Sequence, residues 1–257
     1  MIICIDIGNT NIKYAIYDKD ELKISSRVAT DFKKTSDEYG AQLTGMLAAR
    51  GVSVDEIEGG IVSSVVPSLD YTIDKMCDLY LGIEPLHIAP GLKSGLNIRC
   101  DDAREVGADR IVNCVSAIVE YGEGTPMIVV DFGTATTFDV ISASGELVGV
   151  VIAPGIKTSL ESLATKTAQL PMVEIDAPKT VIGKNTKHCM QAGIIFGFAG
   201  LVENIIKKIK DELGEKDVKV VATGGLGEII ANEVKAINKV DRTLTLDGLR
   251  IIYELNS

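Results

Sequence analysis

The sequence predicts an α/β protein made of two lobes that repeat one plan, with the ligand between them. The first observation behind this prediction is a short acidic loop that occurs twice, as Asp6-Ile7-Gly8-Asn9-Thr10 and as Asp131-Phe132-Gly133-Thr134-Ala135-Thr136-Thr137. The second is that each loop opens a similar succession of strands and helices. Because Asp6 and Asp131 stand 125 positions apart in a chain of 257 residues, each copy begins one half. We therefore expect lobes at residues 1–122 and 123–257.

The first half opens with three expected strands. The segment before Asp6 is apolar, and two runs rich in β-branched and aromatic residues, 12–17 and 22–28, stand on either side of a turn at 18–20. Short apolar runs at 60–66 and 86–89 predict two buried strands, with helices between and after them. The expected product is a mixed sheet flanked by helices.

The second half repeats this order. We expect strands at 127–130, 137–141 and 147–152, a long helix over 189–213, and a further strand at 218–222. The helix carries apolar residues three or four positions apart, which predicts a buried face of Ile194, Phe198, Leu201, Ile205, Ile209 and Leu213. Gly122 and Gly124 interrupt the helical pattern just before this half, so we place the boundary within 120–125.

Composition limits the class of protein. Hydrophobic residues make up 46% of the chain, which is enough for packed cores at this length. A net charge of −10 without a basic cluster argues against nucleic acid or an anionic membrane as partner, although the same surplus also serves solubility. Five scattered cysteines are typical of reduced thiols in a cytoplasmic protein. We expect no zinc site, leader peptide or membrane anchor.

The two acidic loops contain the residue types that a polyphosphate with a hard cation needs. Each offers a carboxylate at a strand end as an anchor for Mg²⁺, then a glycine with bare backbone, then a hydroxyl. One such loop alone is typical of a tight turn without a ligand. Two loops in equivalent places, in a chain without a Gly-x-x-x-x-Gly-Lys-Ser/Thr sequence, favour a nucleotide site built from β-hairpins.

The segment 107–110, Gly-Ala-Asp-Arg, opens a predicted helix with a buried face of Ile111, Val112, Val115, Ile118 and Val119. One interpretation of Asp109 is a carboxylate that stabilises the helix N-terminus. Arg110 does not suit the same dipole, so a second interpretation is a site for a hydroxy acid. In that site the aspartate accepts the hydroxyl proton and the arginine contacts the acid.

Two further segments have both a structural and a functional interpretation. The stretch 220–227 runs from a strand through glycines into a helix, which suits either a tight crossing or a flat surface for adenosine. Ile230 stands where a dinucleotide fingerprint would have its third glycine. The stretch 182–186 precedes the long helix and by itself predicts only an N-cap.

Taken in order, these segments resemble the type III pantothenate kinases, members of the superfamily of acetate and sugar kinases, Hsp70 and actin. The resemblance covers nearly the whole chain. It rests on Asp6-Ile7-Gly8-Asn9-Thr10-Asn11, residues 107–113, residues 131–137, Pro154-Gly155-Ile156, Leu170-Pro171, Gly183-Lys184-Asn185-Thr186, Thr223-Gly224-Gly225 and residues 245–249. It implies actin-like (ribonuclease H-like) lobes with a nucleotide cleft between them. It also implies ATP-dependent phosphorylation of pantothenate to 4'-phosphopantothenate, the first step of coenzyme A biosynthesis.

The resemblance further implies roles for individual residues. Asp109 matches the catalytic base, and the substrate contacts are Cys100, Gly107, Ala108, Asp109, Arg110 and Thr186. The ATP-binding residues are Asp6, Ile7, Gly8, Asn9, Thr10, Asn11, Ile12, Lys13, Thr134, Gly224 and Gly225. Asp6 lies near Mg²⁺ in this scheme, and Asp131 binds a monovalent cation, K⁺ or NH₄⁺. Family members are usually homodimers with the substrate pocket near the subunit interface.

One segment departs from the family pattern. A Tyr-x-Asn-Pro-like stretch usually stands nine residues before the catalytic aspartate, where this chain has Cys100-Asp101-Asp102-Ala103. Loss of the tyrosine removes a phenol donor and an aromatic wall from the expected pocket. Two alternatives stay open. One is another phosphotransferase or phosphatase of the superfamily with a different acceptor, and the other is an inactive relative that serves as an accessory factor in transcription.

Overall fold

The chain forms two compact units in the computed structural model, which describes residues 1–122, 124–215 and 217–257. Unit 1 consists of residues 1–96, 102–116 and 244–257, and unit 2 of residues 97–101 and 117–243. This division differs from the single boundary expected between residues 122 and 123, because the C-terminal segment belongs to unit 1. Glu123, at that boundary, lies outside the described residues.

Unit 1 is built on a five-stranded mixed sheet of order β3-β2-β1-β4-β5. The strands are β1 (Ile2–Ile7), β2 (Asn11–Asp18), β3 (Glu21–Ala29), β4 (Gly59–Ser64) and β5 (Leu86–His87). β1 pairs antiparallel with β2 and parallel with β4. The predicted opening of three strands is therefore confirmed, and so are the two shorter strands that follow it.

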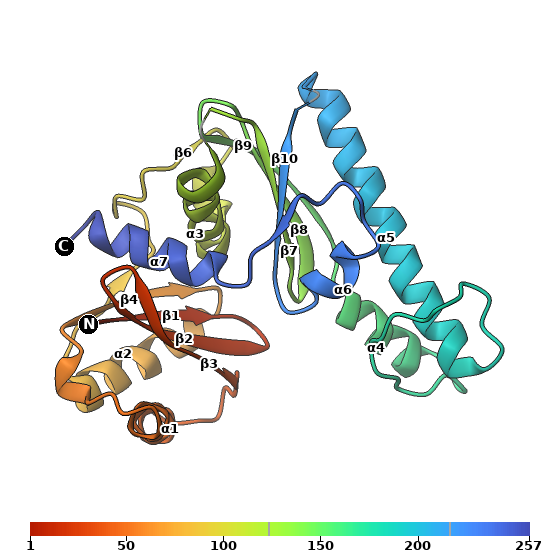
Figure 1. Ribbon diagram of the computed structural model, residues 1–257. Coiled ribbons are helices and arrows are strands. Elements are labelled where there is room, and N and C mark those ends of the chain that lie inside the picture. The colour runs from red at the N-terminus through yellow and green to blue at the C-terminus, as the bar shows by residue number, and fades with distance from the viewer. Residues whose placement is uncertain (123, 216) are drawn as a thin grey trace. The chain divides into compact units, whose positions relative to one another are not determined.

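Helices cover both faces of this sheet (Figure 1). α1 (Ser36–Ala49) and α2 (Pro67–Leu81) lie on one face, and α3 (Ala108–Ala117) and α7 (Leu244–Glu254) contribute to the core on the other. Successive side chains of a strand point to opposite faces, so β1 serves both cores. Ile3, Ile5 and Ile7 pack with α1 and α2, whereas Cys4 packs with α3 and α7. A single hydrophobic strand thus joins two layers.

The place of α7 in unit 1 has a specific cause. The hydroxyl of Tyr17, a fully buried residue, donates to Oδ1 of Asp247 over 2.7 Å, and burial together with this bond raises the pKa of the phenol. Arg250 donates to Asp20 and Glu254 at 2.8 and 2.9 Å, and its guanidinium lies over the Tyr17 ring. These bonds connect α7 to the first strands of the chain. Sequence patterns do not report contacts over such a separation.

Unit 2 contains a six-stranded sheet of order β11-β10-β7-β8-β9-β6. Its strands are β6 (Asn97–Ile98), β7 (Met127–Phe132), β8 (Ala135–Ile141), β9 (Glu146–Pro154), β10 (Lys219–Thr223) and β11 (Lys239–Val240). β7 pairs antiparallel with β8 and parallel with β10. Leaving β6 aside, the order β9-β8-β7-β10-β11 repeats that of unit 1, with the same directions of pairing. The predicted duplication is confirmed, and β6 and β11 are strands that the sequence analysis did not predict.

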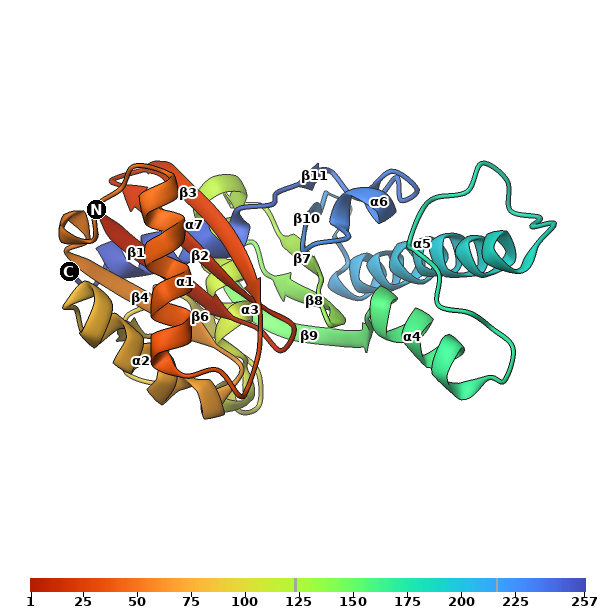
Figure 2. The same cartoon turned by 90° about the horizontal axis from the view of Figure 1, so that it is seen from below.

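The long helix α5 (Thr186–Leu213) packs with α4 (Ile156–Lys166) and α6 (Gly227–Ala231) against one face of the unit 2 sheet (Figure 2). It begins three residues before the expected position 189. Its N-cap is Asn185, from the stretch predicted to cap it, and the Asn185 side chain accepts from the His188 N–H over 2.9 Å. The helix is long and apolar enough to cross a membrane, but half of its most apolar window is buried inside the protein. A helix of a protein core passes the same test of length and composition, so the result is weak evidence for a membrane span.

The buried faces of two helices differ in part from the prediction. In α5 the fully buried residues include Ile195, Val202 and Ile206, whereas Leu201, Ile205 and Leu213 are only partly covered. Ile194, Phe198 and Ile209 are buried as expected. The buried stripe is therefore rotated by about one position, since spacing alone fixes the period of a face better than its centre.

The helix α3 ends earlier than its apolar pattern predicts. Val112 and Val115 are buried as expected, but Val119 is 58% exposed. From Ile118 to Gly122 the chain forms a π-helical turn. Because a π turn holds more residues than an α turn, it changes the phase of the side chains and turns Val119 outward.

Candidate active site

The first acidic loop joins β1 to β2 and places two opposite charges side by side. Asp6, which is 7% exposed, stands directly opposite Lys13 in the β1–β2 ladder, and Lys13 Nζ lies 3.1 Å from Asp6 Oδ2. The Gly8 N–H donates to the carbonyl of Asn11 over 3.0 Å and closes the turn. The Asp6 carboxylate can bind a metal ion, and the ammonium group of Lys13 beside it can contact a phosphate group.

Asp109 lies in the first turn of α3 and combines both interpretations of the sequence. Its Oδ1 accepts from the Arg110 N–H over 2.9 Å, so it does stabilise the helix start. A Cβ on Gly107 would lie 2.6 Å from the same Oδ1, which explains the glycine at that position. Burial raises the pKa of Asp109 and the charge of Asp6 raises it further, while Arg110 opposes both.

These contacts bring part of the predicted site together within unit 1. The charge of Asp6 is close enough to act on Asp109, and Arg110 follows directly in the chain. In the described residues no group of three or more His, Cys, Asp or Glu side chains forms a metal cage. A cation held here would need oxygen atoms from water and phosphate besides Asp6, and Mg²⁺ commonly binds in that way.

The second acidic loop joins β7 to β8, and the residues paired with its aspartate on the two neighbouring strands are uncharged. Asp131 stands opposite Thr137 on β8 and opposite Thr223 on β10. Gly224, at φ +94°, follows Thr223, and a Cβ there would lie 2.6 Å from Asp131 Oδ1 and from the carbonyl of Phe132. Only glycine allows the backbone to pass so close to the carboxylate.

The sequence analysis assigned no role to some residues around this second loop. Thr158, in the first turn of α4, donates its hydroxyl to the carbonyl of Thr134 over 2.8 Å. It stands 24 residues away from Thr134 and lies in no motif, so no pattern could have indicated it. Thr137 and Thr223 do lie within quoted motifs. Their alignment with Asp131 follows only from strand register.

Two further predicted substrate residues, Cys100 and Thr186, belong to unit 2. Cys100 is partly buried in a loop after β6, and Thr186 is exposed at the first position of α5. Within unit 2 the start of α5 lies apart from the β7–β8 loop (Figures 1 and 2). In the segment that departs from the family pattern, both oxygens of Asp102 bind the exposed guanidinium of Arg104 at 3.0 and 2.8 Å.

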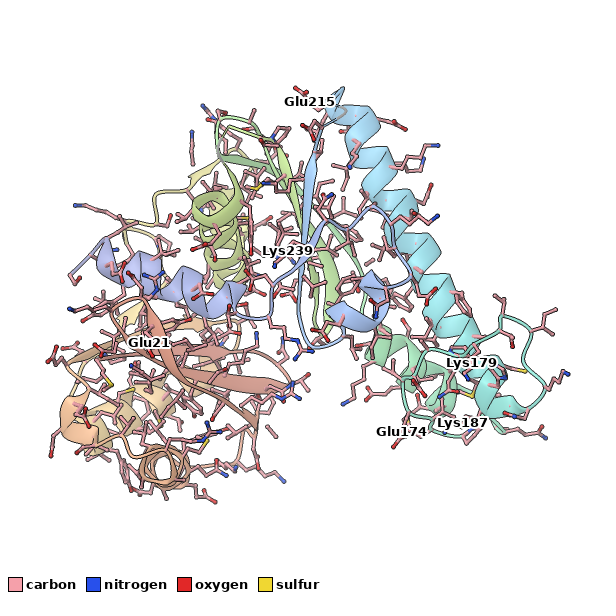
Figure 3. The ribbon with its side chains drawn as sticks, in the orientation of Figure 1. Glu21, Glu174, Lys179, Lys187, Glu215 and Lys239 are labelled. Carbon is pink, nitrogen blue, oxygen red and sulfur yellow. The ribbon has the colours of Figure 1, made fainter. Side chains whose placement is uncertain are left out.

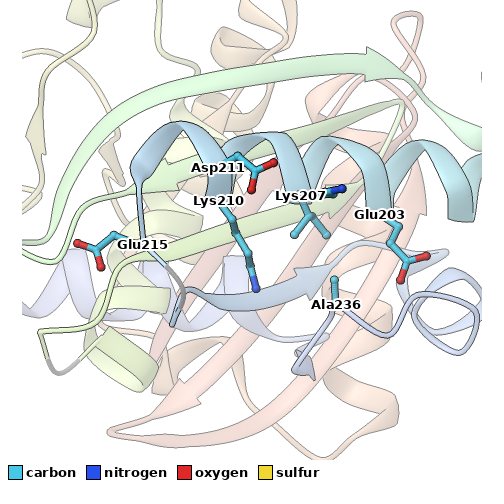
Figure 4. Close-up of a pocket in the computed structure, with 7 residues that line it drawn as sticks. Glu203, Lys207, Lys210, Asp211, Glu215 and Ala236 are labelled. Atoms are coloured by element: carbon cyan, nitrogen blue, oxygen red, sulfur yellow. The ribbon is translucent and has the colours of Figure 1, made fainter.

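A cavity of about 300 Å³ lies along α5 in unit 2 (Figure 4). Its lining includes Glu203, Lys207, Lys210 and Asp211 from that helix, together with Glu215 and Ala236. None of the predicted site residues contributes to it. Three acidic and two basic side chains line it together with Ile206 and Ala236, so its lining gives no clear preference for the charge of a ligand, and we do not assign it to the reaction.

Comparison with known proteins identifies the family. The sequence matches the type III pantothenate kinase family over residues 2–208. This chain belongs to the type III pantothenate kinase family. It is 50% identical over 256 residues to the type III pantothenate kinase of Brevibacillus brevis (strain 47), with 100% of this chain and 99% of that protein covered. It is 51% identical over 257 residues to that of Moorella thermoacetica, with both chains covered fully.

Solved structures confirm the actin-like fold of this pantothenate kinase family member. It resembles the inorganic polyphosphate/ATP-glucomannokinase of Arthrobacter sp. strain KM, with a TM-score of 0.51, 17% identity, and 100% and 99% of the two chains covered. It also resembles the activator of the 2-hydroxyisocaproyl-CoA dehydratase from Clostridium difficile with bound ADPNP, with a TM-score of 0.52, 11% identity, and coverage of 98% and 93%. At such identities the likeness concerns the fold alone.

Proposed function

We propose that this chain transfers the γ-phosphoryl group of ATP to the primary hydroxyl of pantothenate with Asp109 as the catalytic base. The reaction itself, the first step of coenzyme A biosynthesis, follows from membership of the type III pantothenate kinase family. The role of Asp109 is supported by its place in the first turn of α3 and by its raised pKa, which makes the carboxylate a stronger base. That observation carries the assignment.

In the proposed step, the pantothenate oxygen forms a bond to the γ-phosphorus while the bond from that phosphorus to the leaving oxygen of ADP breaks. Asp109 takes the hydroxyl proton, and Arg110 contacts the carboxylate of pantothenate. Lys13 and Thr10 contact the phosphates from the first loop, and Thr134 does so from the second. Phosphoryl transfer depends mainly on such positioning and charge neutralisation, and exclusion of water limits hydrolysis.

Two cations belong to the proposal. Mg²⁺ would lie near Asp6, whose buried carboxylate already attracts the ammonium group of Lys13 at 3.1 Å. K⁺ or NH₄⁺ would be bound by Asp131, beside which stand a threonine on each neighbouring strand and the carbonyl of Phe132. Hard cations prefer oxygen donors of this kind. Their bound charge would offset the negative charge of the phosphates.

We also propose that the enzyme is a cytoplasmic homodimer without nucleic acid or membrane as partner. The net charge of −10 supports the proposed absence of nucleic-acid and membrane partners. Dimerisation is supported by exposed apolar side chains in the α4–α5 region, namely Leu163, Met172, Val181 and Ile182. Figure 3 shows Glu174, Lys179 and Lys187 in the same region, the polar rim expected around an interface core.

A single assay tests the function. ADP release is measured with pantothenate, with a panel of other hydroxy acids and with water as acceptors, each with and without K⁺ or NH₄⁺. We expect release with pantothenate well above the water blank, and higher with a monovalent cation. Equal release with water under every cation would support the phosphatase alternative. Absence of ADP release with every acceptor tested would leave only the inactive relative.

A further inference from the structure

Three neighbouring strands of unit 1 bring three polar residues into one line across the sheet. Asp6 on β1 stands opposite Lys13 on β2 and opposite Ser63 on β4. We call this set the Lys13–Asp6–Ser63 row. Side chains in register on paired strands point to the same face. The row therefore faces the side on which Cys4, two positions from Asp6, packs with α3.

Ser63 is the member of the row without an assigned role. It is completely buried, and its Oγ has no hydrogen-bond partner among the residues that the structure describes. Its neighbour Ser64 behaves differently, because its hydroxyl donates to Asp70 Oδ1 over 2.5 Å and accepts from the Val66 N–H over 3.1 Å. A buried hydroxyl without a partner costs stability that a methyl group would not. A bound ligand that forms a hydrogen bond with Ser63 Oγ would explain why a serine stands at this buried position.

The start of α3 lies near the same end of β4. A Cβ on Gly107 would stand 3.8 Å from Val65 Cγ1, and Val65 is only two residues after Ser63. Asp109 follows Gly107 by two residues and responds to the charge of Asp6. Ser63 is thus buried close to both the carboxylate proposed to hold the cation and the carboxylate proposed as base.

The chemistry of the row indicates which ligand the hydroxyl serves. Ionised Asp6 only accepts hydrogen bonds and Lys13 only donates them, whereas a serine hydroxyl does both. Mg²⁺ in phosphoryl-transfer sites commonly binds one or two carboxylates and keeps several of its water molecules. Those waters donate strongly and need acceptors. A buried hydroxyl directly beside Asp6 is suited to accept from one of them.

We propose that Ser63 is a positioning residue that accepts a hydrogen bond from a water molecule of the divalent cation at Asp6. The inference rests on the proposed place of Mg²⁺ in this enzyme. In this arrangement Asp6 would hold the cation, Lys13 on one side of it would contact phosphate, and Ser63 on the other side would accept a hydrogen bond from a water of the hydration shell. The loss of Ser63 then weakens cation binding without removing a catalytic group.

The test compares Ser63→Ala with the matched variant Ser116→Ala. Ser116 is also completely buried in unit 1 with a hydroxyl that has no partner among the described residues. It lies seven residues beyond Asp109 on α3, about 10 Å along the helix. Binding of Mn²⁺ to the protein in the presence of ADP is measured by electron paramagnetic resonance, corrected for Mn²⁺ bound by ADP alone, and melting temperatures are measured without metal.

We expect Ser63→Ala to weaken Mn²⁺ binding by about 3- to 10-fold, the effect of one hydrogen bond, with an unchanged or higher melting temperature. Ser116→Ala should have the same thermal behaviour and unchanged Mn²⁺ binding. Unaltered Mn²⁺ affinity in Ser63→Ala, whatever its melting temperature, overturns the role of Ser63 alone. If Asp6→Asn binds Mn²⁺ as the wild type does, the place of the cation is wrong and the inference fails with it.

Discussion

The two acidic loops occupy the same place in their sheets and have different neighbours. Each follows the central strand of its sheet, and each aspartate faces one residue on an antiparallel strand and one on a parallel strand. For Asp6 these residues are Lys13 and Ser63, whereas for Asp131 they are two threonines. The strand partners of Asp6 therefore include the positively charged Lys13 side chain, whereas both strand partners of Asp131 carry neutral hydroxyl groups.

The difference shows what duplication preserved and what it allowed to change. Strand order and pairing are the same in both units, because backbone hydrogen bonds and alternating burial are satisfied by many sequences. The side chains next to each aspartate are free to diverge, and with them the ion that the aspartate can serve. The proposed base, Asp109, comes from α3 and lies outside both copies.

The largest expected effect concerns Asp109. If unit 1 supplies the base, Asp109→Asn should lower kcat by about 10²- to 10⁴-fold and leave nucleotide affinity nearly intact, since general-base catalysis contributes on that order. Turnover and ADP affinity are measured on the same preparation, with circular dichroism as the control for folding. Near-normal turnover would show that Asp109 is not the catalytic base, and the base would then have to be sought among other residues.

The second prediction compares equivalent positions in the two loops. Lys13→Ala removes a charged contact to phosphate and should lower kcat/KM for ATP by about 10- to 100-fold. Thr137→Ala, at the matching place beside Asp131, removes a neutral hydroxyl and should lower it by no more than about 10-fold. Steady-state kinetics with varied ATP measure both. Equal losses in the two variants would mean that the loops share the phosphates evenly.

A third prediction concerns the cation of the second loop. Asp131→Asn removes the negative charge proposed to bind the monovalent cation, so the apparent affinity for K⁺ in activation should fall by about 10-fold or more. Activity is titrated with K⁺ at fixed Mg²⁺, and then with Mg²⁺ at fixed K⁺. The Mg²⁺ titration is the internal control and should change little. An unchanged K⁺ titration would contradict the proposed assignment of Asp131.

Local patterns predicted most of the sheets. Alternation and β-branched residues marked the opening strands of both units, and the stretch 182–186 was expected to cap the long helix, as Asn185 does. The two-residue strand β6 was not predicted, because it owes its pairing with β9 to partners distant in the sequence. The segment 244–257 was expected with the second lobe, whereas contacts group it with unit 1, where the hydrogen bond from Tyr17 to Asp247 spans 230 positions.

Motifs indicated the candidate site more fully than they indicated its geometry. Asp6, Asp109 and Asp131 were all selected from the sequence, and the charge of Asp6 contributes to the raised pKa of Asp109. Ser63 carried no such signal, because a serine in an apolar strand is ordinary and only its register with Asp6 distinguishes it. Register depends on pairing between segments, which a single sequence reports weakly.

The smallest expected effect is on stability and follows from the direction of the pKa shift. The folded pKa of Asp109 is raised above the ordinary value of 3.8, mainly by burial, so the folded chain binds this proton more tightly than the unfolded chain. Stability contributed by the protonated acid is present below 3.8 and is lost as pH rises through the raised value.

Asp109→Asn should therefore be more stable than the wild type at pH 7, and the difference should shrink as the pH falls toward 3.8. Urea unfolding at pH 7, 5.5 and 4 without nucleotide or metal measures this trend. The exposed Asp101→Asn serves as a control for the change in net charge. A stability gain of the same size at every pH would mean that the cost of Asp109 does not come from its ionisation, and the raised pKa of this carboxyl would be contradicted.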